Sequence, residues 1–388
     1  MSPLSTLQPA SSTSASGLPS LPWERFGNLV RPGTRIIVTG ASGFIGTNVL
    51  EFYDRAGAEV INLDFREPRN PAQQRFWRNI DIREFEPYNR AVRDFEPEIF
   101  LHLAARTDLD ERKDLQGYAA NMVGVENTLK ALEGLRSVKR IIVTSSQLVC
   151  RPGYVPKNMD DYAPHTLYGE SKVQTELITR AWKKAPCPWT LLRPTSIWGP
   201  WFDIPYKTFF LAVANRKYVH QRGVNPLRSF GFVYNGVYEY VKMTLAPEQL
   251  VDRQTFYLSN IDPIQVREWA DMIQREMGVK HVREVPLGLL VGAAKIGDMA
   301  QRLGWKNPPL TSFRLKNLTG DNIADMEPVS RIVGKMPYTV EEGVEFTVDW
   351  MRREGWIPWA GRVPMVDPPL PRLFPAHVRL QTGLPEGT

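Results

Sequence analysis

The chain has 388 residues, 43% of them hydrophobic and 23% charged, which is the composition of an ordinary globular protein with one large domain and a smaller lobe. Its net charge of +6 is spread along the sequence without an aromatic-plus-basic repeat, so we expect no nucleic-acid partner. Two cysteines exclude a disulfide framework and favour a reducing compartment, and five scattered histidines without metal-ligand spacing predict no metal site.

The first predicted elements follow a tail. Residues 1–20 are rich in Ser, Thr and Pro and lack the basic start and apolar centre of a signal peptide, so we expect a disordered tail over residues 1–32. Arg35–Thr39 is a β-branched apolar run, which predicts a buried strand. A glycine turn from Gly40 to Gly46 leads into a helical stretch over residues 47–53, and Glu59–Asp64 predicts the second strand.

Two further strands are predicted at Ile99–Leu103 and Arg140–Thr144, each after a helical stretch with charged residues. Strands that alternate with helices imply a parallel sheet covered on both faces. The sequence therefore predicts an α/β fold, a Rossmann-type doubly wound parallel sheet, over residues 33–200. Trp189–Arg193 and Thr255–Ser259 predict later strands of the same sheet.

Beyond this domain the strand and helix patterns weaken. We expect residues 201–357 to form mostly a smaller C-terminal substrate-binding lobe, with strands near 227–237 and 255–260 returning to the sheet. The best membrane candidate, Leu287 to Ala294, falls well short of the roughly 20 apolar residues that a membrane helix needs. Residues 358–388 are Pro-rich and predict an extended tail. We therefore expect a cytoplasmic protein without a membrane partner.

The glycine turn lies between a predicted strand and a predicted helix, the context in which such spacing indicates dinucleotide binding. Its first glycine permits the tight turn, its second lets the backbone approach the pyrophosphate, and its third lets helix and strand pack closely. The pyrophosphate would then lie over the N-terminus of the helix. The expected cofactor contacts in this turn are Gly40, Gly43, Phe44, Ile45 and Gly46.

Asp64, at the end of the second strand, indicates which dinucleotide binds. A carboxylate there would accept hydrogen bonds from the adenosine ribose hydroxyls and repel a 2′-phosphate, which predicts NAD. Arg66 and Arg69 follow closely and could partner such a phosphate, so NADP remains the alternative.

Two other segments complete the predicted cofactor site. Asp81 and Ile82 form an acidic–apolar pair that is able to hold the adenine amino group and cover the ring. The strand that contains His102 ends in a segment whose small side chains would let the dinucleotide lie against the backbone: Leu103, Ala104 and Ala105. For His102 itself we expect the ordinary role of a satisfied histidine at a strand end.

Tyr168 and Lys172 place a phenol and an ammonium four residues apart on one face of a predicted helix. A nearby lysine and a positive nicotinamide ring would favour the phenolate and lower the pKa of the tyrosine, which otherwise lies near 10. Tyr238 and Lys242 share this spacing. Position favours Tyr168, because Ser146 stands at the end of the preceding strand and can share the substrate proton.

Together these residues give the chain a resemblance to the NAD-dependent epimerase/dehydratase family of extended short-chain dehydrogenases/reductases. The resemblance covers about residues 35 to 355. The motifs that carry it, in family order, are Gly40–Gly46, Asp64, Asp81-Ile82, His102-Leu-Ala-Ala105, Asn121, Ser146, Tyr168 with Lys172, and Leu192-Arg-Pro-Thr-Ser-Ile-Trp-Gly-Pro200.

The resemblance implies a role for several residues. It implies that Ser146 contacts the substrate hydroxyl, that Tyr168 is the acid/base group and that Lys172 contacts the nicotinamide ribose. It places Asn121 in the support of the active site, among the cofactor-binding set. The remaining assignments are Pro194 and Thr195 near the nicotinamide, Ser196 on the substrate, and Arg228 on the diphosphate of a sugar nucleotide.

The chain also departs from the family pattern in ways that concern the substrate. Cys150 stands where tyrosine is common, Ser196 and Trp198 replace asparagine and tyrosine, and Asn235 replaces aspartate. Gln147 and Leu148 stand where sugar 4,6-dehydratases have an acidic pair, so dehydration has no evident acid and base.

The sequence therefore predicts an NAD-dependent nucleotide-sugar epimerase that inverts C4 through a transient 4-keto intermediate and forms a homodimer through the helices near Asn121 and Tyr168. One alternative is a net dehydrogenase or reductase of a sugar, a sterol-like or another secondary alcohol. The apolar stretch from Pro286 to Ala294, with Trp198 and Trp201, would suit an apolar substrate. The other alternative is a non-catalytic dinucleotide-binding protein.

Overall fold

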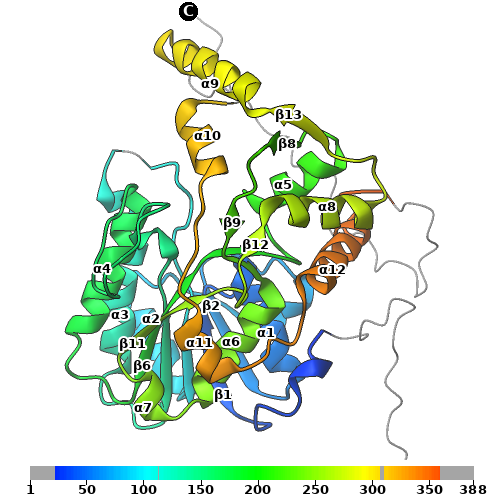
Figure 1. Ribbon diagram of the computed structural model, residues 1–388. Helices are drawn as coiled ribbons and strands as arrows, with labels where there is room; N and C mark the ends of the chain where they lie inside the picture. Colours follow the sequence, from blue (N-terminus) through cyan, green and yellow to red (C-terminus); the bar gives the residue numbers. More distant parts are fainter. Residues whose placement is uncertain (1–21, 112, 306–309, 359–388) are drawn as a thin grey trace, which may run out of the picture.

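The computed structural model describes residues 22–111, 113–305 and 310–358 (Figure 1). Its centre is a seven-stranded sheet in the order β11-β6-β5-β4-β1-β2-β3, with every neighbouring pair parallel. The strands are β1 (Arg35–Thr39), β2 (Glu59–Asp64), β3 (Trp77–Asn79), β4 (Ile99–His102), β5 (Arg140–Thr144), β6 (Trp189–Pro194) and β11 (Gln254–Leu258). The predicted doubly wound α/β fold is confirmed. Sequence analysis missed β3, a short strand at the sheet edge whose residues are partly or fully exposed.

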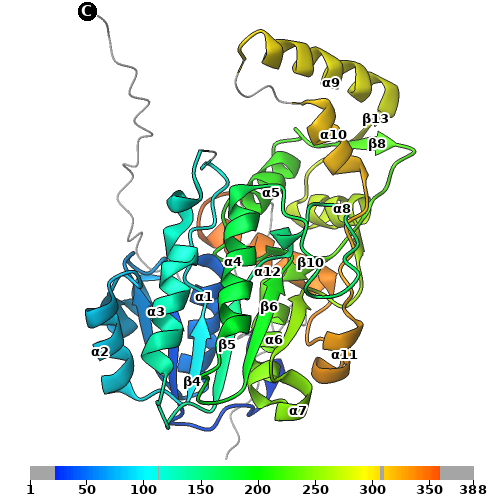
Figure 2. The same ribbon diagram turned by 90° about the vertical axis from the view of Figure 1, so that its left-hand side faces the viewer.

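Helices cover both faces of the sheet (Figures 1 and 2). Alternate residues of β1 show this directly, because Ile36 and Val38 belong to one hydrophobic cluster and Ile37 to another. The helices on the first face are α1 (Phe44–Arg55) and α6 (Val233–Leu245), and those on the second are α2 (Phe85–Phe95), α3 (Val123–Leu132) and α4 (Leu167–Ala181).

The register of the strands brings the predicted cofactor residues to one edge. Thr39, the last residue of β1, pairs with Leu63 of β2 on one side and with His102 of β4 on the other. Parallel strands that end in register leave the residues after them side by side, which is where open α/β sheets bind ligands. The glycine turn, Asp64 and the segment after His102 therefore meet at the carboxyl ends of the central strands.

The C-terminal lobe is built from short strand pairs and helices. The pairs are β7 (Ser196–Trp198) with β10 (Phe230–Phe232), β9 (Leu227–Arg228) with β12 (Ile264–Gln265), and β8 (Val219–Arg222) with β13 (Arg283–Pro286). The helices are α5 (Tyr206–Ala214), α8 (Val266–Met277), α9 (Leu287–Arg302), α10 (Ser312–Thr319) and α12 (Val340–Arg353). Two others, α7 (Glu248–Val251) and α11 (Glu327–Val333), contact β11 of the sheet.

One predicted return to the sheet is wrong. Only the segment near 255–260 enters the seven-stranded sheet, as β11. Residues 227–237 instead supply one strand to each of two short pairs of the lobe, β9 and β10, and then the first turn of α6. The alternation of apolar and polar residues in this segment is too short to indicate which strand it pairs with.

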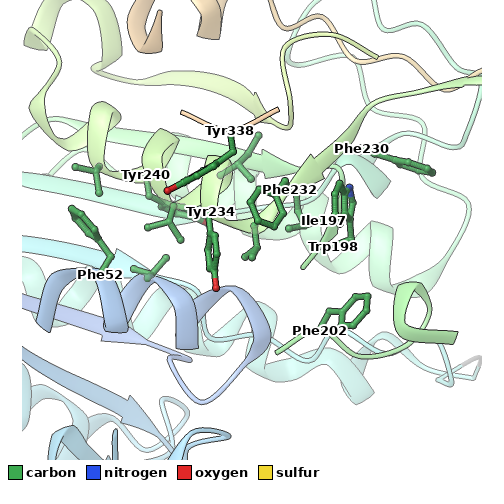
Figure 3. Close-up of a cluster of buried hydrophobic side chains, with 14 of the residues drawn as sticks. Phe52, Ile197, Trp198, Phe202, Phe230, Phe232, Tyr234, Tyr240 and Tyr338 are labelled. Carbon is green, nitrogen blue, oxygen red and sulfur yellow. The ribbon is translucent and has the colours of Figure 1, made fainter. Parts of the chain in front are cut away.

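The lobe shares its core with the sheet. Trp198 and Phe232 from the lobe belong to the same buried cluster as Phe52 of α1 and Tyr240 of α6, and Figure 3 shows these rings as one aromatic layer. The Trp198 and Phe232 ring centroids lie 5.2 Å apart. A shared core fixes the lobe against the sheet, so the site between them is built on a rigid frame.

The N-terminal segment is packed from residue 22 onward, which corrects the predicted tail over residues 1–32. A 3₁₀ turn, η1 (Glu24–Phe26), buries Trp23 and Phe26 in the shared core. The ring centroid of Trp23 lies 4.7 Å from that of Tyr234. The other 3₁₀ turns are η2 (Pro71–Phe76), η3 (Leu115–Asn121) and η4 (Gln147–Val149).

Residues 1–21 and 359–388, which contain the rest of the two predicted tails, lie outside the described residues. Within the part that the structure describes, no helix combines the length and the apolar character needed to cross a membrane.

Removing the Phe26 ring should destabilise the whole fold, because the side chain is 4% exposed and fills the shared core. We expect Phe26→Ala to lower the free energy of unfolding by about 3–5 kcal/mol in urea titrations followed by circular dichroism. Leu250→Ala, at a side chain that is 52% exposed, is the control and should change it by less than about 0.5 kcal/mol. Equal stability of the two variants would show that this segment is not part of the core.

Candidate active site

The glycine turn is shaped by close contacts that exclude side chains. Gly40 has a φ of +72°, and a Cβ there would lie 2.5 Å from the backbone nitrogen of Ala104. A Cβ on Gly46 would lie 2.5 Å from the carbonyl oxygen of Gly40. The first and third glycines are thus required by the backbone positions of the turn, of α1 and of the segment after β4. Gly43 stands at the N-cap of α1, followed by Phe44 and Ile45 in its first turn.

Asp64 offers a buried oxygen at the edge of this turn. Its Oδ1 accepts a hydrogen bond from the Arg66 backbone nitrogen at 2.9 Å, whereas its buried Oδ2 has no partner among the described residues. Burial raises the pKa of this carboxyl group. A buried acceptor without a donor raises the free energy of the folded chain, so a ligand hydroxyl that donates to this oxygen would bind favourably. The ribose of a dinucleotide supplies such hydroxyls.

The two arginines beyond Asp64 differ in their surroundings. Arg69 donates from Nη1 to the Trp201 carbonyl oxygen at 3.2 Å and lies 3.6 Å from an Asp203 carboxylate oxygen. Its guanidinium is therefore directed to the loop after β7 rather than to the ribose edge. Arg66 is exposed and its guanidinium carbon lies 5.5 Å from the centroid of the Phe65 ring.

Asp81 and Ile82 lie between β3 and α2. The carboxylate of Asp81 is 2.5 Å from the Arg83 guanidinium, which holds the pKa of Asp81 below its usual range. Ile82 is buried against α3, where a Cβ on Gly124 would lie 2.3 Å from its Cδ1. Contacts of this pair with adenine remain a prediction, and Arg83 is the partner that sequence reasoning did not include.

The predicted catalytic residues meet at the carboxyl end of β5. Ser146 follows this strand, and its hydroxyl accepts a hydrogen bond from the Leu148 backbone nitrogen at 3.1 Å. It also acts on Tyr168 of α4, whose pKa it lowers. One turn along α4, the Lys172 ammonium donates to the Thr144 carbonyl oxygen at 2.9 Å. The helix begins at the Thr166 N-cap, whose side chain accepts from the Gly169 nitrogen. Helix and strand end thus bring phenol, hydroxyl and ammonium together.

Burial dominates the pKa values of the pair. It raises the pKa of Tyr168 to about 12, opposed by Ser146. Burial also lowers the pKa of Lys172 to about 8, opposed by the negative charge of Glu176. The expectation that Lys172 together with a nicotinamide ring lowers the tyrosine pKa stays a prediction.

A buried ion pair holds α4 against the sheet. Glu176 lies one turn beyond Lys172 and its Oε1 is 2.7 Å from the Arg193 Nε of β6, with both side chains fully buried. The same oxygen accepts a hydrogen bond from Ser145 Oγ at 2.6 Å, next to Ser146 in the chain. Because both charges are buried and partnered, loss of one would leave the other without compensation.

Asn121 supports the site through its amide. Its Oδ1 accepts from the Arg106 backbone nitrogen at 2.8 Å, and its Nδ2 donates to the Arg106 carbonyl oxygen at 3.0 Å and to Ser171 Oγ at 2.9 Å. These bonds connect the loop after β4 with α4. These distances agree with a supporting role for Asn121. A direct contact between Asn121 and the cofactor remains a prediction.

The predicted substrate residues lie on one connected side of the site. The Gln147 amide donates to Ser196 Oγ at 3.4 Å and accepts from Asn322 Nδ2 at 3.4 Å. Ser196 also acts on Tyr206 of α5, whose pKa it lowers. Arg228 is half-buried next to Asn322 through a β-bridge and has its pKa lowered by burial, opposed by Tyr206.

Sequence reasoning missed Tyr206 and Asn322. Tyr206 opens α5 and Asn322 follows α10, both far along the chain from Ser146. Neither falls in a recognisable motif, so only the folded chain could bring them to the site. Pro194 and Thr195 lie at the end of β6, where the Thr195 nitrogen donates to the Leu258 carbonyl oxygen at 3.0 Å.

Several residues considered from sequence serve the framework instead. Trp198 is fully buried among Phe210, Phe232 and Trp269, so the expectation that it lines an apolar substrate site is wrong. Tyr238 packs on Phe26 with ring centroids 5.1 Å apart, in keeping with a packing residue.

The substituted family positions are also tied to the framework. Asn235 bonds the backbone of Tyr338, and Cys150 donates to the Asp161 carbonyl oxygen at 3.4 Å.

His102 is only partly satisfied. Its Nδ1 lies 3.0 Å from Thr39 Oγ1 and 3.2 Å from Thr128 Oγ1, whereas its buried Nε2 has no partner among the described residues. Burial and the Lys172 charge lower its pKa to about 3, so the ring is neutral at physiological pH. Within the described residues there is no group of three or more His, Cys, Asp or Glu side chains that could hold a metal ion.

Comparison with known proteins agrees with this geometry. The model of the NAD dependent epimerase/dehydratase family matches residues 36–256. N-acetyl-alpha-D-glucosaminyl-diphospho-ditrans,octacis-undecaprenol 4-epimerase from Escherichia coli O157:H7 is 27% identical over 81% of this chain and 94% of its own. A 3 beta-hydroxysteroid dehydrogenase/Delta 5-->4-isomerase from Mycobacterium tuberculosis is 25% identical over 80% of this chain and 88% of its own.

The fold is also that of solved structures. UDP-glucuronic acid 4-epimerase from Bacillus cereus, in complex with UDP-glucuronic acid and NAD, gives a TM-score of 0.63 at 18% identity, covering 83% of this chain and 100% of that one. An epimerase from Burkholderia cenocepacia gives a TM-score of 0.64 at 23% identity, covering 83% and 99%. At these identities the likeness describes the fold alone.

The unpartnered oxygen of Asp64 generates a prediction about cofactor choice. NAD should bind at least tenfold more tightly than NADP in calorimetry, about 1.4 kcal/mol, because the carboxylate repels a 2′-phosphate. Asp64→Asn should narrow that difference while Asp81→Asn, at a carboxylate already paired with Arg83, should leave it unchanged. Equal or tighter binding of NADP by the unmodified chain would contradict the assignment and direct attention to Arg66.

Proposed function

Because the chain belongs to the NAD dependent epimerase/dehydratase family, we propose that it is an NAD-dependent isomerase that inverts C4 of a nucleotide sugar. One observation carries the proposal: Ser146, Tyr168 and Lys172 lie beside Gln147, which bonds Asn322, and Asn322 forms a β-bridge with Arg228. The site therefore combines a proton-transfer group, Tyr168, with a cation, Arg228.

The residues around the glycine turn fit NAD. Gly40 and Gly46 allow the tight turn that such cofactors need, and the Asp64 Oδ2 lacks a donor that a ribose hydroxyl would supply. Lys172 stands where it can bond the second ribose. Bound NAD would supply the acceptor and donor of a hydride.

The protein's own part is proton transfer. Tyr168 is protonated at neutral pH, since its pKa is about 12, so acting as a base requires that this pKa fall. The Lys172 ammonium and the positive nicotinamide ring are the charges that act in this direction. The C4 hydroxyl proton would pass through Ser146 or directly to the phenolate as the hydroxyl becomes a ketone, and would return in the reverse step.

Inversion requires the ketone to turn within the site. A guanidinium at Arg228 can make paired, charge-assisted hydrogen bonds to a diphosphate, which anchors the substrate at a point away from C4. The sugar ring, held more weakly at Ser146 and Tyr168, is then able to present its other face. Gln147 and Leu148 carry no carboxylate, so elimination of water lacks an acid and base beside Tyr168.

A second candidate is net oxidation of a secondary alcohol, favoured by the 25% identity to hydroxysteroid dehydrogenases. It needs Ser146, Tyr168 and Lys172 but has no use for Arg228. The undecaprenol-diphosphate-linked relative points instead to a diphosphate on the substrate, which Arg228 could bind whatever the group beyond it. A cytoplasmic location and a homodimer through α3 and α4 remain predictions.

The two Tyr–Lys pairs can be compared directly. Tyr168→Phe should reduce turnover by about 10²–10⁴-fold with NAD binding retained, because it deletes the proton-transfer hydroxyl and little volume. Tyr238→Phe, on the packing tyrosine, is the matched control and should keep full turnover. Loss of activity in the control with retention in Tyr168→Phe would show that the other pair is catalytic.

The choice between isomerase and dehydrogenase can be made with a panel of nucleotide sugars, separating products and following reduced cofactor by absorbance. We expect C4 epimers to interconvert without added NAD and without lasting reduced cofactor. Arg228→Ala should raise KM at least tenfold and leave NAD affinity unchanged, whereas Arg331→Ala, on the exposed surface of α11, should do neither. Stoichiometric accumulation of NADH, or turnover only of alcohols without a diphosphate, would reject epimerisation.

A further inference from the structure

The outer side of α9 carries an exposed apolar face. Leu289, Ala293, Ile296, Met299 and Leu303 recur three or four residues apart, which places them along one side of the helix. Leu289, Ile296 and Leu303 are 67%, 65% and 81% exposed. We call these five residues the apolar face of α9. Trp305, 56% exposed, follows the helix directly.

The opposite side of α9 is held by the protein. Ala294 and Gly297 are buried, and the helix contacts α10, whose Leu315 is also buried. Asp298 Oδ1 accepts from the Ser312 nitrogen at the start of α10 at 3.0 Å. The helix therefore has a definite orientation, and its apolar face is turned outward.

The position of α9 in the molecule agrees with this exposure. In both views α9 lies at one end of the molecule, beyond α10 and away from the seven-stranded sheet (Figures 1 and 2). Large exposed apolar patches on a folded protein mark sites that bind another surface.

Positive charge borders the apolar face. Lys295 and Arg302 are exposed on the flank of α9, and Lys316 is exposed on the neighbouring α10. A second copy of this face would bring like charges together, which argues against pairing of two copies.

Nearby acidic groups are already engaged. Glu284 is paired with Arg267 and Arg222, and Asp298 caps α10. The basic flank is thus not neutralised by these carboxylates. An apolar face bordered by lysine and arginine is the composition of helices that lie in the interface of an anionic bilayer.

We propose that α9 binds the surface of an anionic phospholipid bilayer, with its apolar face among the acyl chains and Lys295, Arg302 and Lys316 on the headgroups. The proposed contact is peripheral and differs from our sequence-based expectation of no membrane partner. It does not depend on the reaction proposed above.

Co-sedimentation of the full chain with vesicles tests the proposal. The bound fraction should be low with phosphatidylcholine alone, and the apparent affinity should rise by about tenfold or more with an equimolar mixture of phosphatidylcholine and phosphatidylglycerol. High salt should reverse that rise, because screening weakens the headgroup contacts. Equal binding to the two kinds of vesicle, or no binding to either, would overturn the proposal.

Paired variants distinguish binding through the apolar face of α9 from nonspecific binding through other exposed apolar side chains. Leu289→Asp with Ile296→Asp should abolish vesicle binding, and the thermal unfolding midpoint should not fall, because both side chains are exposed. Leu245→Asp with Leu250→Asp, at side chains 49% and 52% exposed on the other end of the molecule, should bind vesicles like the unmodified chain.

Sedimentation velocity without lipid tests the rival occupant. We expect the α9 variant and the unmodified chain to have the same oligomeric state. An oligomer that dissociates only in the α9 variant, together with absent vesicle binding, would assign the face to a second copy of the chain.

Discussion

The site depends on how α4 is fixed against the ends of β5 and β6. Tyr168, Lys172 and Glu176 lie on successive turns of the helix. Lys172 bonds the Thr144 carbonyl oxygen, Glu176 pairs with Arg193, and Ser146 acts on Tyr168, whose pKa it lowers. The Glu176–Arg193 pair is fully buried, so it cannot be broken without leaving a charge in the core. The helix therefore has one position, and that position sets the phenol against the serine.

The burial that fixes α4 also shifts the pKa values of the pair. It raises the pKa of Tyr168 to about 12 and lowers the pKa of Lys172 to about 8. Each shift disfavours the charged form of its group, yet Lys172 is still mostly protonated at neutral pH while Tyr168 is neutral. In the function proposed above, a positive nicotinamide ring beside the phenol would favour the phenolate.

Sequence reasoning succeeded where a local pattern carries the physical requirement. The glycine turn was predictable because each glycine answers a contact within one strand–turn–helix unit, and the central strands were predictable from buried β-branched runs. Partners distant in sequence left no such pattern: Tyr206, Asn322 and the packing of Trp23 into the core are set by tertiary contacts. The Leu287–Ala294 run was too short for a membrane span, and only the fold showed which side of its helix is exposed.

The central claim is that the chain moves protons while the hydride of C4 leaves and returns within one closed site. A nucleotide sugar carrying deuterium at C4, incubated with the protein in ordinary water and analysed by NMR, tests this most directly. The account predicts that both C4 epimers keep the deuterium at C4, because the same hydride returns to the ketone. Loss of the label to water, or its appearance in added NAD, would contradict the account.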